Sequence, residues 1–85
     1  MVDISKLRAD MEAALPPLIA RSEVSRYSGG LYSAKTLEVY DSKGIGIPEN
    51  ERVRMDRKIA YTKNGFINWI ISKIEEKQHD TATRD

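Results

Sequence analysis

The side chains best suited to chemistry are basic, and they are concentrated between residues 52 and 63. Arg52, Arg54, Arg57, Lys58 and Lys63 stand there against a single acid, Asp56, which gives the segment a net charge of +4. The whole chain of 85 residues carries only +1. A local excess of guanidinium and ammonium groups attracts polyanions even when the protein is close to neutral. Charge alone does not separate this hypothesis from the simpler one of a solvated, charged hairpin.

The sequence offers few residues for other kinds of functional site. The chain has no cysteine and one histidine, so disulfides, thiol catalysis and cysteine-based zinc sites are excluded. The histidine, His79, has no partner at a spacing suited to a metal ion, and no dense carboxylate cluster offers an acid–base pair. The Gly44-Ile45-Gly46 segment lacks the Lys-Ser/Thr pair of a phosphate-binding loop. We therefore expect no enzymatic activity, no metal, no cofactor and no small-molecule ligand.

The composition predicts one small folded domain. Hydrophobic residues make up 40% and charged residues 32% of the chain, proportions typical of a globular domain rather than a disordered segment. No apolar run reaches the roughly 18 residues that a membrane span needs. The first residues lack the apolar segment of a secretory signal. We therefore expect a cytoplasmic protein without a membrane partner.

The basic segment needs a scaffold, and the first element of that scaffold is an amphipathic helix within residues 1–17. Its apolar residues are spaced at three, four and four positions: Ile4, Leu7, Met11 and Leu15. This spacing forms one stripe of a helix. Asp3 suits the N-cap, and Pro16-Pro17 must end the helix. The stripe either caps the domain or supplies a dimer contact, and the sequence leaves both open.

Two short helices follow an extended piece at residues 18–21. Ser22 is a suitable cap for the first helix, which Gly29-Gly30 ends. Ser33 is a suitable cap for the second, over residues 34–41, which closes near Gly44. Two short capped helices joined by a glycine-containing turn are typical of a helix-turn-helix.

A basic β-hairpin and a last helix complete the expected order of elements. Alternation over residues 52–61 around an Asp56-Arg57 turn predicts the hairpin. We expect its inward side chains to be Val53, Met55, Ile59 and Tyr61, and its outward ones to be Arg52, Arg54 and Lys58, with Arg57 at the tip. Thr62 then caps a helix whose apolar residues are Phe66, Ile67, Trp69, Ile70, Ile71 and Ile74. Residues 77–85 are expected to be a frayed polar tail.

Several short motifs resemble the DNA-binding domain of phage excisionases and AlpA-type regulators, which is similar to MerR-like domains. The first helix of that domain is similar to Arg21-Ser22-Glu23-Val24 followed by Tyr27-Ser28-Gly29-Gly30. The second helix is similar to Ser33-Ala34-Lys35-Thr36-Leu37. Its wing and closing helix resemble Gly44-Ile45-Gly46-Ile47-Pro48, Arg57-Lys58-Ile59-Ala60-Tyr61 and Phe66-Ile67-Asn68-Trp69-Ile70. The resemblance covers residues 18–74.

This resemblance implies a winged helix-turn-helix, a mainly α fold with a small β-hairpin, over residues 18–76. Two departures stand out. The Gly29-Gly30-Leu31-Tyr32 turn is longer than in the tightest members of the family, and the first 15 residues have no counterpart in it.

The resemblance also implies DNA binding, and helix geometry suggests which residues take part. If Leu37 and Tyr40 face the core, then Lys35, Glu38 and Val39 lie on the opposite face. Side chains at the start of a recognition helix reach base edges in the major groove. Lys35 suits a guanine, Glu38 a cytosine, and Val39 and Ala34 a thymine methyl group. Ser33 falls where backbone contacts are usual, and Lys35 is equally well explained as an ordinary exposed lysine.

The hairpin supplies the expected phosphate contacts. Arg52, Arg54, Arg57 and Lys58 suit the DNA backbone or a narrow minor groove. Arg57 has the alternative of tying the hairpin tip to a carboxylate such as Glu49 or Asp56. Lys63, in the first turn of the last helix, suits a phosphate or plain solvation.

The sequence thus predicts sequence-recognising binding of duplex DNA by a transcriptional regulator of phage or mobile-element type, or by an excisionase-like architectural factor, acting at the bacterial nucleoid. Self-association or cooperative binding on the DNA is left open. Two alternatives remain: DNA recognition like that of a phage terminase small subunit, and a protein-interaction module that binds no DNA.

Overall fold

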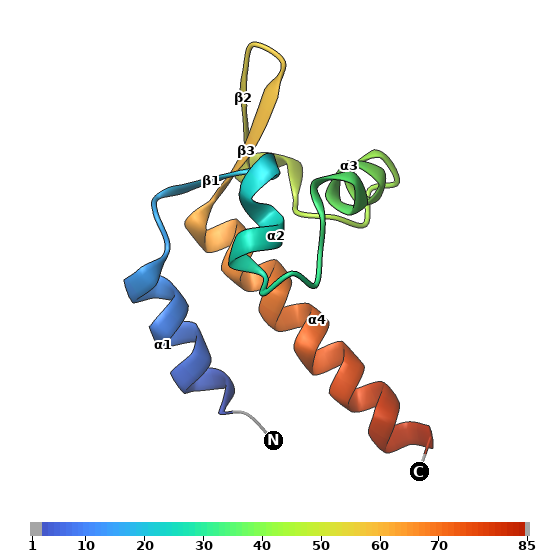
Figure 1. Ribbon diagram of the computed structural model, residues 1–85. Helices are drawn as coiled ribbons and strands as arrows, with labels where there is room; N and C mark the ends of the chain where they lie inside the picture. Colours follow the sequence, from blue (N-terminus) through green and yellow to red (C-terminus); the bar gives the residue numbers. More distant parts are fainter. Residues whose placement is uncertain (1–2, 85) are drawn as a thin grey trace.

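The computed structural model describes the backbone of residues 3–84 and the side chains of residues 3–74 (Figure 1). In chain order the elements are α1 (Ile4–Ala14), β1 (Leu18–Ala20), the 3-10 turn η1 (Arg21–Glu23), α2 (Val24–Tyr27), α3 (Ala34–Ser42), the 3-10 turn η2 (Glu49–Glu51), β2 (Arg52–Met55), β3 (Lys58–Thr62) and α4 (Lys63–Arg84). The predicted mainly helical fold with a small antiparallel hairpin is confirmed at this level. No helix in this part of the chain has the length and apolarity to cross a membrane.

Helix α1 lies along α4 and caps the domain. Its N-cap is Asp3, whose carboxylate accepts a hydrogen bond from the backbone N–H of Lys6. The apolar stripe packs against the core through Ile4, Leu7 and Met11. Figure 1 shows the two helices side by side at the N-terminal half of α4. The stripe is therefore covered within the chain, which supports the capping role over the dimer contact.

The sheet has three strands in the order β1-β3-β2, all antiparallel. The sequence predicted a two-stranded hairpin, with a short strand or an extended piece at 18–21. That piece becomes β1 because its residues pair with β3, Ile19 opposite Tyr61. Beyond the pairing, the backbone N–H of Lys63 donates to the carbonyl of Pro17 at 2.9 Å. A third strand matters physically, since an isolated two-stranded ribbon is only marginally stable in water.

The predicted faces were right for β3, where Ile59 and Tyr61 lie inside and Lys58 outside, but wrong for β2. The register places Arg52 opposite Tyr61 and Arg54 opposite Ile59, and directly opposed residues share a face. The two arginines therefore lie on the side of the buried Tyr61, not opposite to it. Met55, expected inside, pairs with Lys58 and is 58% exposed. The cause is the two-residue turn, which makes even positions of β2 share a face with odd positions of β3.

Helix α4 supplies four of the ten buried apolar residues within residues 3–74, more than any other element. Thr62 caps it as predicted, with its Oγ1 accepting a hydrogen bond from the N–H of Gly65 at 3.0 Å. The buried apolar residues are Leu15, Ile19, Val24, Leu37, Ile47, Tyr61, Phe66, Ile67, Trp69 and Ile71. The helix continues to Arg84, where a frayed tail was expected over 77–85, because no glycine or proline follows Gly65 to end it. The side chain of His79 lies outside the described residues.

The α2–α3 unit is closed by glycines, as the sequence predicted. Gly29 and Gly30 follow α2 with φ of 68° and 82°, a conformation that glycine adopts without steric cost. Ser33 caps α3, accepting a hydrogen bond from the N–H of Thr36 at 3.2 Å. The first cap was wrong: Ser22 lies inside η1 and makes no cap hydrogen bond. The α-helical part is correspondingly shorter than expected and begins at Val24.

Candidate functional site

An open groove of about 420 Å³ separates the start of α3 from the start of β3. Its lining residues come from β1, η1, α3 and the hairpin: Ala20, Arg21, Ser22, Ala34, Glu38, Arg57, Lys58 and Ile59. Past Ala20 the chain leaves the sheet, so the edge of β3 at Lys58 and Ile59 is unpaired on that side. The groove therefore brings together four of the predicted site residues: Ala34 and Glu38 from α3, and Arg57 and Lys58 from the hairpin.

The solvent-facing side of α3 carries a polar pair. Lys35 and Glu38 are exposed, and Lys35 Nζ lies 3.2 Å from Glu38 Oε1. A pair with side chains 81% and 56% exposed is worth little, so either group can exchange its partner for another at small cost. Val39 is half-buried and lies beside this face rather than at its centre. Ser33 is exposed, but its hydroxyl is engaged as the helix cap.

The hairpin presents three exposed cations, Arg54, Arg57 and Lys58. Arg54 Nε makes a long hydrogen bond of 3.4 Å to the carbonyl of Asp56, within the hairpin tip. Arg57 makes no ion pair with any side chain among residues 3–74, so the alternative in which it ties the tip to Glu49 or Asp56 finds no support. Cations held this loosely remain available to an anion from solution.

Two predicted site residues lie apart from the groove. Lys63 donates from Nζ to the backbone carbonyl of Glu12 at 3.0 Å, so it faces α1 at the base of the sheet. Arg52 is half-buried beside Tyr61, and its Nε is enclosed without a hydrogen-bond partner among the described residues. Neither side chain is placed like the three cations nearer the hairpin tip.

A buried polar network, which the sequence did not predict, links η1, α3 and β3. Asp41 Oδ2 accepts hydrogen bonds from Tyr61 Oη at 2.6 Å and from Arg21 Nη2 at 2.7 Å. Arg21 Nε also donates to Tyr61 Oη at 2.9 Å, which closes the triangle. The Asp41 side chain is 3% exposed, and a buried carboxylate is tolerated only when it is paired and hydrogen-bonded. The sequence offered one signal: Asp41 lies one turn from Leu37, on the buried face of its helix.

The network keeps Tyr61 protonated. Burial first, and then the hydrogen bond to Asp41, raise the pKa of Tyr61 to about 12, against a smaller opposing effect of Arg21. Burial by itself would lower the pKa of Arg21, but the hydrogen bonds to Tyr61 and Asp41 outweigh it and leave that pKa raised. Near neutral pH, therefore, Tyr61 keeps its proton and donates a hydrogen bond to Asp41, and Arg21 stays charged.

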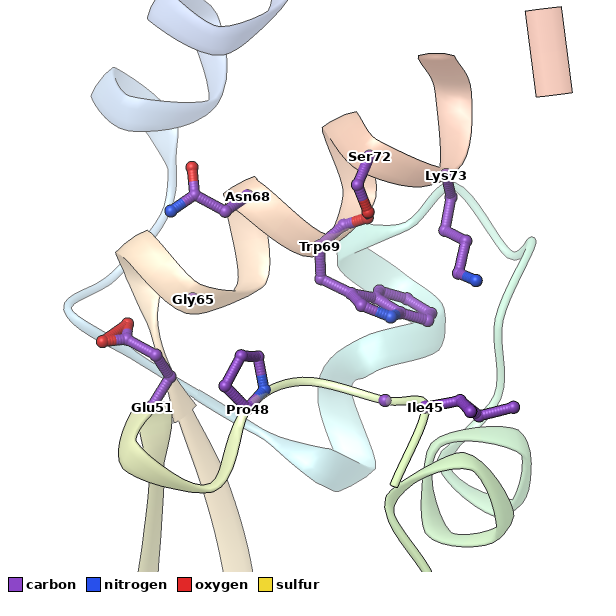
Figure 2. A pocket seen from close by; sticks show the side chains of 9 residues that line it. Ile45, Pro48, Glu51, Gly65, Asn68, Trp69, Ser72 and Lys73 are labelled. Carbon is purple, nitrogen blue, oxygen red and sulfur yellow. The ribbon is translucent and has the colours of Figure 1, made fainter. Parts of the chain in front are cut away.

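A second cavity, of about 320 Å³, lies between the loop before β2 and helix α4 (Figure 2). Ile45 and Pro48 line it from the loop, and Asn68, Trp69 and Lys73 from the helix. Trp69 is 6% exposed, and its ring meets that of Tyr32 edge-on at 4.8 Å. It also meets the Tyr40 ring at 6.2 Å. Trp69 and Tyr40 are thus packing residues, as the sequence predicted.

Within residues 3–74 no three His, Asp or Glu side chains lie close enough to hold a metal ion. What the groove does offer is a set of cations beside an exposed helical face. Comparison of the chain with protein families, with curated proteins and with solved structures finds no match.

Proposed function

We propose that this protein binds duplex DNA and recognises sequence, with α2 and α3 acting as a helix-turn-helix and the β2–β3 hairpin as a wing. One observation carries the proposal: the exposed, N-terminal part of α3 lies across a single groove from Arg57 and Lys58 of the basic hairpin. A major groove about 12 Å wide admits one α-helix. A neighbouring basic hairpin then meets the flanking phosphates, which fix the register of the helix on the duplex.

The proposed contacts are of two kinds, those that recognise bases and those that bind the DNA backbone. Lys35 reads a guanine and Glu38 a cytosine, since both are exposed on the free face of α3. Ala34, in the groove wall, contacts a thymine methyl group. Arg54 and Arg57 bind phosphate or enter the minor groove, as guanidinium groups do where that groove is narrow.

Five predicted contacts remain outside this division. One is Ser33, whose hydroxyl caps α3. Lys58 binds phosphate like Arg57, because it lines the same groove. Val39, half-buried, is a marginal contact. Arg52 and Lys63 are left out of the interface, because one is partly enclosed and the other is bonded to α1.

The motifs quoted above, which resemble those of phage excisionases and AlpA-type regulators, support the same reading. Together they favour a regulator of phage or mobile-element type, or an architectural factor of recombination. Target selection from a random duplex library would distinguish a single operator from the packaging site expected of a terminase-like protein.

The salt dependence of binding tests the proposal. Four exposed cations come from α3 and the hairpin: Lys35, Arg54, Arg57 and Lys58. Of these, Arg57 and Lys58 line the groove. Each neutralised phosphate contributes about −0.9 to the slope of log K against log salt. If Lys35 contacts a base and the hairpin cations contact phosphate, the slope is about −3; with all four on phosphate it approaches −4. Fluorescence anisotropy of a labelled duplex, recorded between about 50 and 300 mM salt, measures this slope. A slope near zero contradicts the proposal.

An exposed apolar side chain favours a second candidate, a protein-interaction module. Leu31, in the turn between α2 and α3, is 81% exposed. It lines a hollow of about 290 Å³ together with Tyr32 and Ile70. Absence of any duplex binding at low salt would favour this candidate over DNA binding.

A further inference from the structure

We infer that Arg21 is a phosphate-binding residue of the groove, held ready for the DNA backbone by Asp41 and Tyr61. The inference rests on the proposed function, because it assigns a ligand group to the same groove. It adds a contact outside the charged hairpin and outside the exposed face of α3. It also gives the buried network a role in recognition besides its role in stability.

The geometry leaves part of the Arg21 guanidinium available. Arginine has five N–H donors in a rigid planar fork. Two hydrogen bonds of Arg21 are made inside the protein, from Nε to Tyr61 Oη at 2.9 Å and from Nη2 to Asp41 Oδ2 at 2.7 Å. Its Nη1 group has no hydrogen-bond partner among residues 3–74. The side chain is 21% exposed and lines the groove next to Ser22.

The surroundings of this group suit an anion. Lys58 and Arg57 line the same groove, and Ser22 adds a hydroxyl donor. The one acidic side chain in the lining, Glu38, comes from the α3 wall, where it is already beside Lys35. A phosphate bound by Arg21 and Lys58 would thus meet donors from η1 and β3 together. Phosphate and the guanidinium fork match geometrically, with two parallel hydrogen bonds.

The network makes Arg21 a different kind of contact from the hairpin cations. Arg54 and Arg57 are exposed, and they lose side-chain entropy when they bind. Arg21 is already fixed by two hydrogen bonds, so it loses less. Its charge is largely balanced by Asp41, so it contributes little to long-range attraction. We therefore expect Arg21 to position the duplex rather than to steer it.

Fixing the phosphate also fixes α3 on the DNA. Asp41 belongs to α3 and Tyr61 to β3, so a phosphate on Arg21 is held at a set place relative to both. Backbone contacts of this kind determine the register in which a recognition helix meets the base edges. Loss of the Arg21 contact should thus weaken binding and reduce the preference for the selected site.

A paired substitution tests the inference. Arg21→Met combined with Asp41→Asn removes both charges at once, so no buried charge is left without a partner. The matched control is Lys6→Met with Asp10→Asn, which removes an exposed ion pair on α1, away from the groove. Both double variants keep the net charge. We expect the first to bind a duplex about three- to tenfold more weakly with little change in the salt slope, because the removed ion pair is close to neutral, and the control to match the unmodified protein.

Chemically altered DNA locates the contact. Duplexes carrying one neutral methylphosphonate at successive positions remove one phosphate charge at a time. One position should weaken the unmodified protein but leave the Arg21→Met/Asp41→Asn variant unaffected. If the variant binds as tightly as the unmodified protein and is weakened at the same methylphosphonate positions, the inference is wrong while the proposed function stands. If the unmodified protein binds no duplex at low salt, the proposed function itself fails.

A measurement on the unmodified protein covers the case in which the double variant does not fold. NMR of the arginine side chains follows the Nη groups of Arg21 directly. Addition of duplex DNA should shift these signals and slow the rotation of the guanidinium, since Nη1 gains a partner. Unchanged Arg21 signals beside shifted signals of Arg54 or Lys35 would overturn the inference.

Discussion

Replacement of Trp69 by alanine should remove much of the free energy of unfolding. Trp69, in the second turn of α4, is 6% exposed, and its ring meets those of Tyr32 and Tyr40 edge-on. A buried aromatic side chain covers about 150–250 Å², worth about 4–6 kcal/mol at 25 cal/mol per Å². Truncations of buried Phe or Trp to Ala cost about 3–5 kcal/mol. A domain of 85 residues has roughly 4–13 kcal/mol in total, so the variant should be barely folded.

Replacement of Trp69 by phenylalanine is the matched control. The indole Nε1 is enclosed and has no hydrogen-bond partner among the described residues. Phenylalanine therefore loses no hydrogen bond there and keeps a ring against Tyr32, at a cost of about 1–2 kcal/mol for the altered shape. Urea unfolding followed by circular dichroism measures both variants without relying on tryptophan fluorescence. Native-like unfolding of Trp69→Ala would refute the reasoning and show that the ring contributes little to the core.

Three further predictions concern recognition, close packing and pH. Lys35→Ala should lose about 1–3 kcal/mol of affinity on the selected site and much less on unrelated DNA, whereas Arg54→Ala should lose similar amounts on both. Gly46→Ala should destabilise the fold by about 1–3 kcal/mol, because a Cβ there would overlap the Asp41 carboxylate. Stability should also fall as pH rises from about 10 to about 12. The raised pKa of Tyr61, about 12 in the folded state, means that its neutral form stabilises the fold below that range.

Each of these has a control and a contradicting outcome. Equal losses of Lys35→Ala on both duplexes would reduce Lys35 to a backbone contact. Gly44→Ala is the control for Gly46→Ala, since Gly44 has φ of 74° but open space around it, so only backbone strain of about 1 kcal/mol applies. A Gly46→Ala variant no less stable than this control would contradict the packing argument. Alkaline unfolding of Tyr61→Phe should lack the loss between pH 10 and 12, and an identical profile would contradict it.

The elements of the fold were predictable where the signal is local. The caps at Ser33 and Thr62 need only a side-chain oxygen and a backbone N–H three residues later. The stripe of α1 repeats at the helical period, which predicts the helix and its apolar face but not that this face packs onto α4. The grouping of Arg57 and Lys58 with α3 came from the resemblance, and the groove brings these residues together.

The hairpin faces were predictable too, but the prediction placed the odd-numbered residues of both strands on the same face. A two-residue turn pairs residue 55 with residue 58, so Arg54 must share a face with Ile59. Apolar character suggested Met55 for the interior, yet its face of the sheet has no covering helix. The apolar character of Met55 therefore predicted the wrong face, and the strand register would have predicted the right one.

The Arg21, Asp41 and Tyr61 network depends on contacts that no local pattern contains. Arg21 and Tyr61 are separated by 40 residues, and they meet only after β1 has paired with β3. Once they meet, several unrelated features of the sequence have one explanation. Asp41 can occupy the buried face of α3, Tyr61 can bury its hydroxyl, and Gly46 must lack a side chain because the chain passes against Asp41. The charged residues that are easiest to see in the sequence lie on the hairpin, whereas the residue that fixes α3 against the sheet is a half-buried arginine at its edge.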